Sequence, residues 1–173
     1  MESKFFFIAA SVCILTHIIR SIYEILKHKN KVKADKLSFV IIFTNMMLLW
    51  VSWFALCSFD IYRIHFPAAI SFAGLTIAVI GLVVFLTGLL TIKSLESYDG
   101  ELITKGIYSV IRHPMYLGFI CWLTGFPIFY GGLYSFFLAV IFIINVLFWR
   151  NLEEKELVKR FSGYSDYKKS TIF

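Results

Sequence analysis

Residues 68–92 read AAISFAGLTIAVIGLVVFLTGLLTI, an apolar run that contains no charged residue and no histidine. An α-helix needs about 20 apolar residues to cross the roughly 30 Å hydrocarbon layer of a bilayer. This stretch therefore predicts a transmembrane helix. Four further apolar runs predict helices of the same kind, at residues 5–26, 37–59, 114–130 and 133–149.

The composition agrees with a membrane protein. Hydrophobic residues make up 59% of the 173 residues and charged residues only 16%, whereas a soluble domain has roughly 45–50% apolar and about 25% charged residues. Disordered, fibrous and disulfide-rich classes are excluded, and a nucleic-acid partner is disfavoured in spite of the net charge of +6. We expect an all-α integral membrane bundle of five transmembrane helices with a C-terminal cytoplasmic amphipathic helix. It would be one domain, 1–173, with a three-helix part at 1–92 and the cofactor-binding part at 93–173.

Basic residues predict the orientation of this bundle. The loop at residues 27–36 carries five lysines, residues 93–113 carry three basic residues, and residues 150–173 carry six. The loop at residues 60–67 carries only Arg63. Because positively charged loops stay in the cytoplasm, we expect the N-terminus outside and the three basic segments inside.

Glycine recurs every seven residues in two of the predicted helices. Seven residues are nearly two helical turns, so each set lies close to one helix face. Glycine on a face lets two helix backbones approach closely. The pattern predicts close helix packing at Gly74, Gly81 and Gly88 and at Gly118, Gly125 and Gly132.

Polar residues gather in two segments that the topology brings together. One is the long connection at residues 93–113, and a polar connection of that length is typical of a functional loop. The other is the tail at residues 150–173. The two helices between them form a hairpin joined by Gly131 and Gly132, so their cytoplasmic ends are neighbours. We expect a site where these segments face each other.

The start of the fourth helix offers one half of that site. Pro114 suits the first position of a helix and places His113 at its cap. The first N–H groups of a helix lack partners, and with Arg112 and His113 they favour an anion. Alternatively, Arg112 pairs with lipid phosphate and His113 only caps the helix.

The tail offers the other half. Glu153 and Glu154 follow Arg150 at three and four residues. One interpretation is a surface amphipathic helix with weak ion pairs inside it. The other is that an acid accepts hydrogen bonds from ligand hydroxyls or an amine.

Two motifs resemble a known family. Residues 106–118, GIYSVIRHPMYLG, resemble the G-x-Y-x-x-x-R-H-P-x-Y-x-G signature of isoprenylcysteine carboxyl methyltransferases. Residues 153–167, EEKELVKRFSGYSDY, resemble that family's E-E-x-x-L-x-x-x-F-G-x-x-Y-x-x-Y tail. Phospholipid N-methyltransferases, in the same wider superfamily, are similar there.

The resemblance implies S-adenosylmethionine as the cofactor and no metal. No G-x-G-x-x-G loop is present, so the cofactor would bind between membrane helices and not on a Rossmann sheet. The resemblance also implies that Arg150 engages the substrate carboxylate as the catalytic residue. The implied cofactor-binding residues are Gly100, Glu101, Leu102, Ile103, Tyr108, His113, Pro114, Met115, Tyr116 and Glu153.

The predicted activity is therefore methyl transfer to a lipid-borne nucleophile, with membrane lipids and a lipidic or prenylated small substrate as partners. The favoured reaction is O-methylation of an isoprenylcysteine-like carboxylate. Alternatives are N-methylation of a phospholipid or other lipid, an NADPH-dependent sterol-type reductase, whose family shares an R-H-P-x-Y element, and a non-catalytic membrane subunit.

Overall fold

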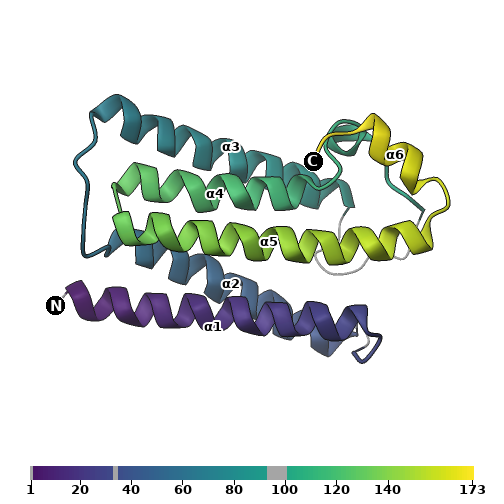
Figure 1. Cartoon of the computed structure of the whole chain (residues 1–173), viewed down its shortest axis with the longest axis horizontal. Helices are drawn as coiled ribbons and strands as arrows, with labels where there is room; N and C mark the ends of the chain where they lie inside the picture. Colours follow the sequence, from purple (N-terminus) through teal and green to yellow (C-terminus); the bar gives the residue numbers. More distant parts are fainter. Residues whose placement is uncertain (1, 33–34, 93–100) are drawn as a thin grey trace.

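The computed structural model describes residues 2–32, 35–92 and 101–173, and every regular element within them is helical. Figure 1 shows long helices that run side by side, with a short turn at residues 131–132 joining two of them. The elements are α1 (Glu2–His28), α2 (Lys36–Ser58), α3 (Ala68–Ile92), a 3-10 turn η1 (Gly106–Ser109), α4 (Pro114–Tyr130), α5 (Leu133–Arg160) and α6 (Tyr164–Ser170).

Four of these helices, α1, α2, α3 and α5, are long and apolar enough to cross a membrane. The shorter α4 has 17 residues and so a length of about 25 Å. Their outer faces expose large apolar side chains, such as Val51 and Leu90, as expected of helices that face lipid.

The tail differs from the prediction in one respect. The predicted span at residues 133–149 does not end there, because α5 continues to Arg160. Residues 150–160 contain neither glycine nor proline and are rich in Leu, Glu, Lys and Arg, which are good helix formers. The predicted amphipathic segment is therefore the last part of α5, and the separate C-terminal helix is the short α6.

The glycine pattern marks the interface between α3 and α4. A Cβ on Gly125 would lie 2.6 Å from the carbonyl oxygen of Gly74, and one on Gly81 would lie 2.6 Å from that of Gly118. A Cβ on Gly88 would meet the first residue of α4 at 2.9 Å. The two helices therefore pack closely at the five glycines within them, as the spacing predicts, whereas Gly132 precedes α5 and lies against Asp60 and Ser135.

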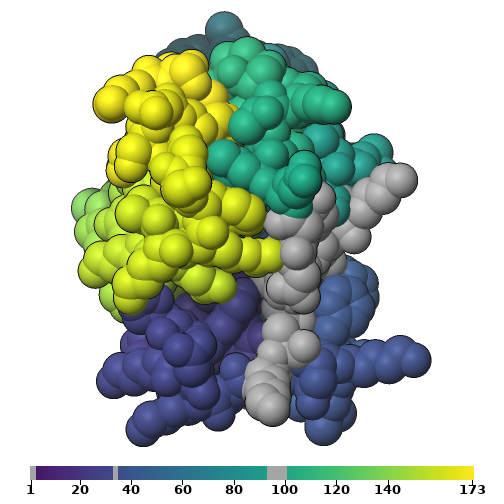
Figure 2. Space-filling model, turned by 90° about the vertical axis from the view of Figure 1, so that its right-hand side faces the viewer, coloured from purple at the N-terminus to yellow at the C-terminus, as the bar shows by residue number. Residues whose placement is uncertain are grey.

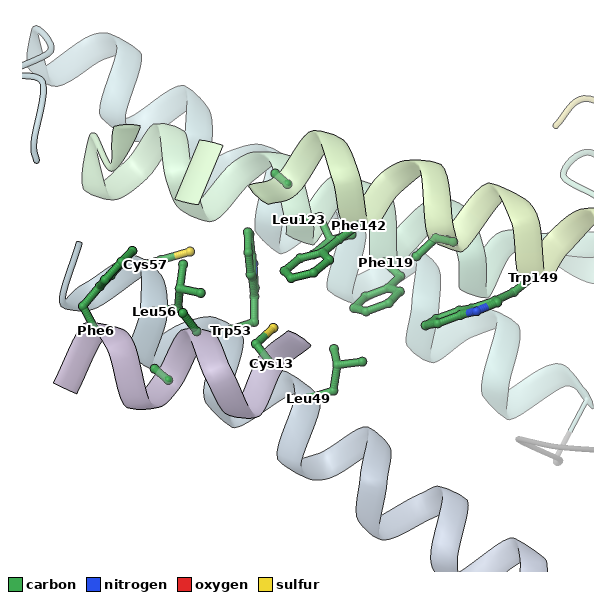
Figure 3. Packing of buried hydrophobic residues seen from close by; sticks show 14 residues of the cluster. Phe6, Cys13, Leu49, Trp53, Leu56, Cys57, Phe119, Leu123, Phe142 and Trp149 are labelled. Carbon is green, nitrogen blue, oxygen red and sulfur yellow. The ribbon is translucent and has the colours of Figure 1, made fainter. Parts of the chain in front are cut away.

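A second interface joins the α1–α2 hairpin to α4 and α5. Trp53 of α2 lies edge-on to Phe142 of α5, with ring centres 5.6 Å apart. Figure 3 shows these side chains meeting in one apolar cluster. Its fully enclosed members include Cys13, Leu49, Trp53, Leu56, Cys57, Leu123 and Val146.

At the end of the bundle that holds the N-terminus, Asp60 fixes the hairpin turn. Its carboxylate accepts hydrogen bonds from the backbone N–H of Tyr62 (3.0 Å) and of Ser135 in the first turn of α5 (2.7 Å). The N–H of Ile64 donates to the carbonyl of Gly131 at 2.7 Å. An acid at a helix N-terminus satisfies unpaired donors and the helix dipole. These contacts join the α2–α3 loop to the α4–α5 turn, and the polar segments 101–113 and 150–173 lie at the other end.

Candidate functional site

A cavity of about 580 Å³ lies at the end of the bundle where α2 and α4 begin. Small-molecule sites are typically about 300–1,000 Å³. Figure 2 views this end, with α6 and residues 101–113 above and the ends of α1 and α2 below. Eight of the ten predicted cofactor residues line the cavity: Glu101, Leu102, Ile103, Tyr108, His113, Met115, Tyr116 and Glu153.

Glu153 contributes its carboxylate to the cavity from α5. The hydroxyl of Tyr116, on α4, lies within hydrogen-bonding reach of this carboxylate. The charges of Lys27 and Arg20, on α1, also act on it. Three helices thus meet around one acid, and that acid can accept hydrogen bonds from a ligand hydroxyl or amine.

Glu154 is the next residue along α5, and its carboxylate contacts a different set of side chains. Its Oε1 lies 3.1 Å from Nε of Arg112 and 3.4 Å from Nε2 of His113, and its Oε2 lies 2.6 Å from Nζ of Lys168. Successive residues of a helix are about 100° apart, so the paired acids serve different partners. Glu154 ties the segment before α4, the end of α5 and the tail to one another.

His113 stands between that network and the cavity. Its Nε2 lies 3.3 Å from the hydroxyl of Tyr164, and the side chain is almost fully enclosed. Burial lowers the pKa of His113 to about 4, against a smaller upward effect from the charge of Glu154. Burial likewise raises the pKa of Tyr164. Both groups are therefore neutral near pH 7, and the imidazole offers one donor and one acceptor.

The tail covers the segment that leads into α4. The N–H of Arg112 donates to the carbonyl of Ile172 at 3.0 Å, and its Nη1 donates to the carbonyl of Thr171 at 2.8 Å. The hydroxyl of Tyr167 donates to the backbone carbonyl of Tyr108 at 2.6 Å. These contacts confirm that the two polar segments meet, as the hairpin topology predicts.

Of the described residues, one predicted cofactor residue, Pro114, and the predicted catalytic residue, Arg150, lie apart from this lining. Gly100 lies outside the described residues. Pro114 is fully buried, with its ring facing Gly88 of α3, and is not part of the cavity wall. The guanidinium of Arg150 lies 4.7 Å from the ring centre of Phe173 and is also outside the lining. Arg150 is therefore not part of the cavity wall, although its charge acts on His113, and its role stays a prediction.

The cavity also contains residues that the motif comparison misses. Arg20 and Glu24 of α1 line it, and so do Met46 and Trp50 of α2. A sequence signal exists for the first two, because ionisable residues within an apolar span are functional candidates. No comparable signal marks the α2 residues, since their composition is that of any apolar helix.

Fold and site together define a class: a helical membrane protein with a cavity near the ends of its helices that is lined by both polar and apolar side chains. A comparison with protein-family models places residues 69–163, more than half of the chain, in the phospholipid methyltransferase family. The chain belongs to this family.

Curated relatives agree with the resemblance found in the sequence. The chain is 31% identical over 80 residues to "Protein-S-isoprenylcysteine O-methyltransferase" of Schizosaccharomyces pombe, covering 45% of this chain and 34% of that protein. It is 34% identical over 80 residues to "Methanethiol S-methyltransferase" of Pseudomonas deceptionensis, covering 46% and 30%. It is 30% identical over 113 residues to "Protein-S-isoprenylcysteine O-methyltransferase B" of Arabidopsis thaliana, covering 57% and 55%. The aligned part thus spans between about a third and a half of these relatives.

Proposed function

We propose that this chain is an S-adenosylmethionine-dependent methyltransferase whose cofactor binds in the cavity described above. One observation carries the proposal: His113 of the first motif and Glu153 of the second line the same cavity. These residues lie 40 positions apart in the sequence, His113 at the cap of α4 and Glu153 on α5. A site that holds one nucleoside between them requires this convergence.

The residues that line the cavity fit the polar groups of that cofactor. Glu153 would accept hydrogen bonds from ribose hydroxyls or the amino group. The cofactor carboxylate would be held by His113 and by the first N–H groups of α4, which receive no side-chain cap. Tyr108 and Tyr116 would present aromatic surface to a cation. When bound, S-adenosylmethionine supplies an activated methyl group on a sulfonium centre.

The methyl acceptor would be a lipidic molecule, and its carboxylate is the proposed nucleophile. An ionised carboxylate needs no residue to remove a proton near neutral pH, so the chain has to position the acceptor and exclude water. Apolar residues of α2 form the wall that an acyl or prenyl chain would contact, among them Ile42, Met46 and Trp50. The names of two relatives support an isoprenylcysteine-like acceptor. The family description keeps phospholipid N-methylation as the second candidate.

We also propose that α4 crosses the membrane beside α3 and α5, which gives five spans. The N-terminus would then lie outside and the cavity at the cytoplasmic face. Lys27, Lys29, Lys31 and Lys36 lie at the cavity end, in support of this orientation.

The experiment compares cofactor binding in the wild type and two variants. Purified protein in detergent is tested by thermal shift and calorimetry with S-adenosylhomocysteine, with NADPH and with buffer. We expect stabilisation by S-adenosylhomocysteine alone. Glu153→Gln should weaken its binding at least about tenfold, since a hydrogen bond to a charged group contributes about 1.5–3 kcal/mol. Asp166→Asn, an exposed acid on α6, is the matched control and should bind normally.

Methyl transfer is then measured with a radiolabelled donor and a panel of prenylated thiol acids, fatty acids and aminophospholipids. Label in a base-labile ester would support the carboxylate, and label on an amine would support the second candidate. Unchanged binding of S-adenosylhomocysteine by Glu153→Gln would refute the assignment of the cofactor site.

A further inference from the structure

Arg20 is a buried cation that the motifs do not account for. It lies in α1, four residues before Glu24, and its Nη2 pairs with that carboxylate. Only 8% of Arg20 and 7% of Glu24 are exposed. Both residues line the cavity. A buried ion pair contributes little net stability because desolvation offsets its attraction, so stability alone is a weak explanation for its position.

The guanidinium is held in one orientation by its surroundings. Its central carbon lies 5.7 Å from the ring centre of Tyr23 and 6.0 Å from that of Trp149 on α5. Its Nε is buried without a hydrogen-bond partner among the described residues. An orphaned N–H on a buried, oriented guanidinium is unusual, and guanidinium geometry matches a carboxylate.

The cavity places this cation beside the proposed reaction centre. The opposite charges of Glu24 and Arg20 both act on Tyr116 and on Glu153, so this ion pair lies near the residues proposed to hold the cofactor. The partner of α1 in its hairpin is α2, which supplies the apolar wall. An acceptor with an anionic end and an apolar chain would thus meet the guanidinium of Arg20 and the apolar wall from α2 within one cavity. Arg150 also has a buried Nε without a hydrogen-bond partner among the described residues, but it lies outside the cavity lining, against Phe173.

We propose that Arg20, oriented by Glu24 and Trp149, binds the carboxylate of the methyl acceptor and makes the enzyme specific for anionic lipids. This inference rests on the proposed methyltransferase function. It assigns the substrate-binding role to α1, whereas the motif in the tail assigns it to Arg150.

The test measures binding, without turnover, of two probes that differ only at the anionic end. The probes are N-acetyl-S-farnesylcysteine and its carboxamide, titrated into full-length protein in detergent with S-adenosylhomocysteine present. We expect the wild type to bind the acid at least about tenfold more tightly than the amide, as a charge-assisted pair would require. Arg20→Gln should remove this preference and leave the affinity for the amide unchanged.

Three other variants show whether a change in the preference is specific to the guanidinium of Arg20. Arg20→Lys retains the charge but not the forked geometry of the guanidinium, so it should lose part of the preference for the acid over the amide. This variant also replaces Arg20→Gln if Arg20→Gln fails to fold. Arg63→Gln, an exposed arginine at the opposite end, should change nothing. Arg150→Gln should retain the preference.

The inference is overturned if the wild type binds acid and amide equally or binds neither. It is also overturned if Arg20→Gln keeps the preference, if Arg20→Lys binds the acid as the wild type does, or if Arg150→Gln loses the preference. Failure of the wild type to bind S-adenosylhomocysteine would instead refute the proposed function, and the two failures are therefore distinguishable.

Discussion

Replacing Glu154 by alanine should release the tail from the segment that leads into α4. The carboxylate contacts Nε of Arg112 at 3.1 Å, Nε2 of His113 at 3.4 Å and Nζ of Lys168 at 2.6 Å. Among the described residues, no other acid forms an ion pair with Arg112. The substitution therefore leaves a buried guanidinium without its counter-charge.

The size of the effect follows from the burial of each partner. The side chains of Arg112 and Glu154 are only 9% and 11% exposed, and removing one member of a buried pair costs about 3–5 kcal/mol. Lys168 is 49% exposed, so its pair adds less than about 1 kcal/mol. The hydrogen bonds from Arg112 to the tail carbonyls remain in the variant. We therefore expect a loss of stability at the lower limit of this range, about 3 kcal/mol. In a protein of this size that corresponds to a fall in Tm of about 6–12 °C.

The assay is thermal unfolding in detergent, combined with limited trypsin digestion at Lys168 and Lys169. We expect Glu154→Ala to unfold at lower temperature and to be cleaved faster in the tail. Glu154→Gln should show about half the effect, because an amide oxygen still accepts one hydrogen bond. Asp166→Ala removes an acid that is 85% exposed and should change Tm by less than about 2 °C. A Glu154→Ala protein with wild-type Tm and wild-type cleavage would refute the role of this carboxylate as a clamp.

The remaining predictions concern helix packing and pH. Gly125→Ala places a Cβ 2.6 Å from the carbonyl oxygen of Gly74, so overpacking should destabilise the protein by about 1–3 kcal/mol or more. Gly163→Ala is the control, because a Cβ there meets nothing within 4 Å. An equal Tm for the two variants would contradict the close contact between α3 and α4. Because burial lowers the pKa of His113 from 6.5 to about 4, the unfolded chain binds more protons between these values. Stability from this residue is complete above pH 6.5 and declines on acidification, by about 2 kcal/mol at pH 5. Thermal unfolding from pH 7.5 to 5 should show a steeper decline for the wild type than for His113→Gln, and parallel curves would contradict the buried neutral imidazole.

Much of the fold can be predicted from the sequence because lipid imposes simple rules. Apolar length locates the long helices, and the glycine spacing identifies the faces of α3 and α4 that touch. The extent of α5 is harder to predict, since its apolar part ends at Trp149 while the helix continues to Arg160. Hydropathy detects the boundary of the membrane, and helix propensity decides where the helix ends.

The candidate site, like the fold, can be predicted from the sequence only in part. Its half from α4 and α5 can be predicted because the two motifs lie on a hairpin, and a hairpin brings its open ends together. Its other half comes from α1 and α2, and their position against α5 depends on apolar packing such as that of Trp53 on Phe142. Packing of that kind leaves no local motif. Arg20 and Glu24 stand out only as charges in an apolar span, and the sequence alone does not connect them to a residue more than a hundred positions away.

The two adjacent acids of the tail explain why loss of the Glu154 contacts should also affect ligand binding in the cavity. Because adjacent residues on a helix diverge by about 100°, Glu153 faces the cavity while Glu154 holds the segment containing Arg112 and His113. The tail fixed by Glu154 includes Tyr164 and Tyr167, which also line the cavity. Loss of Glu154 therefore removes part of the wall around the position that Glu153 serves. It follows that Glu154→Ala should weaken S-adenosylhomocysteine binding together with Tm, whereas Glu153→Gln should weaken binding alone.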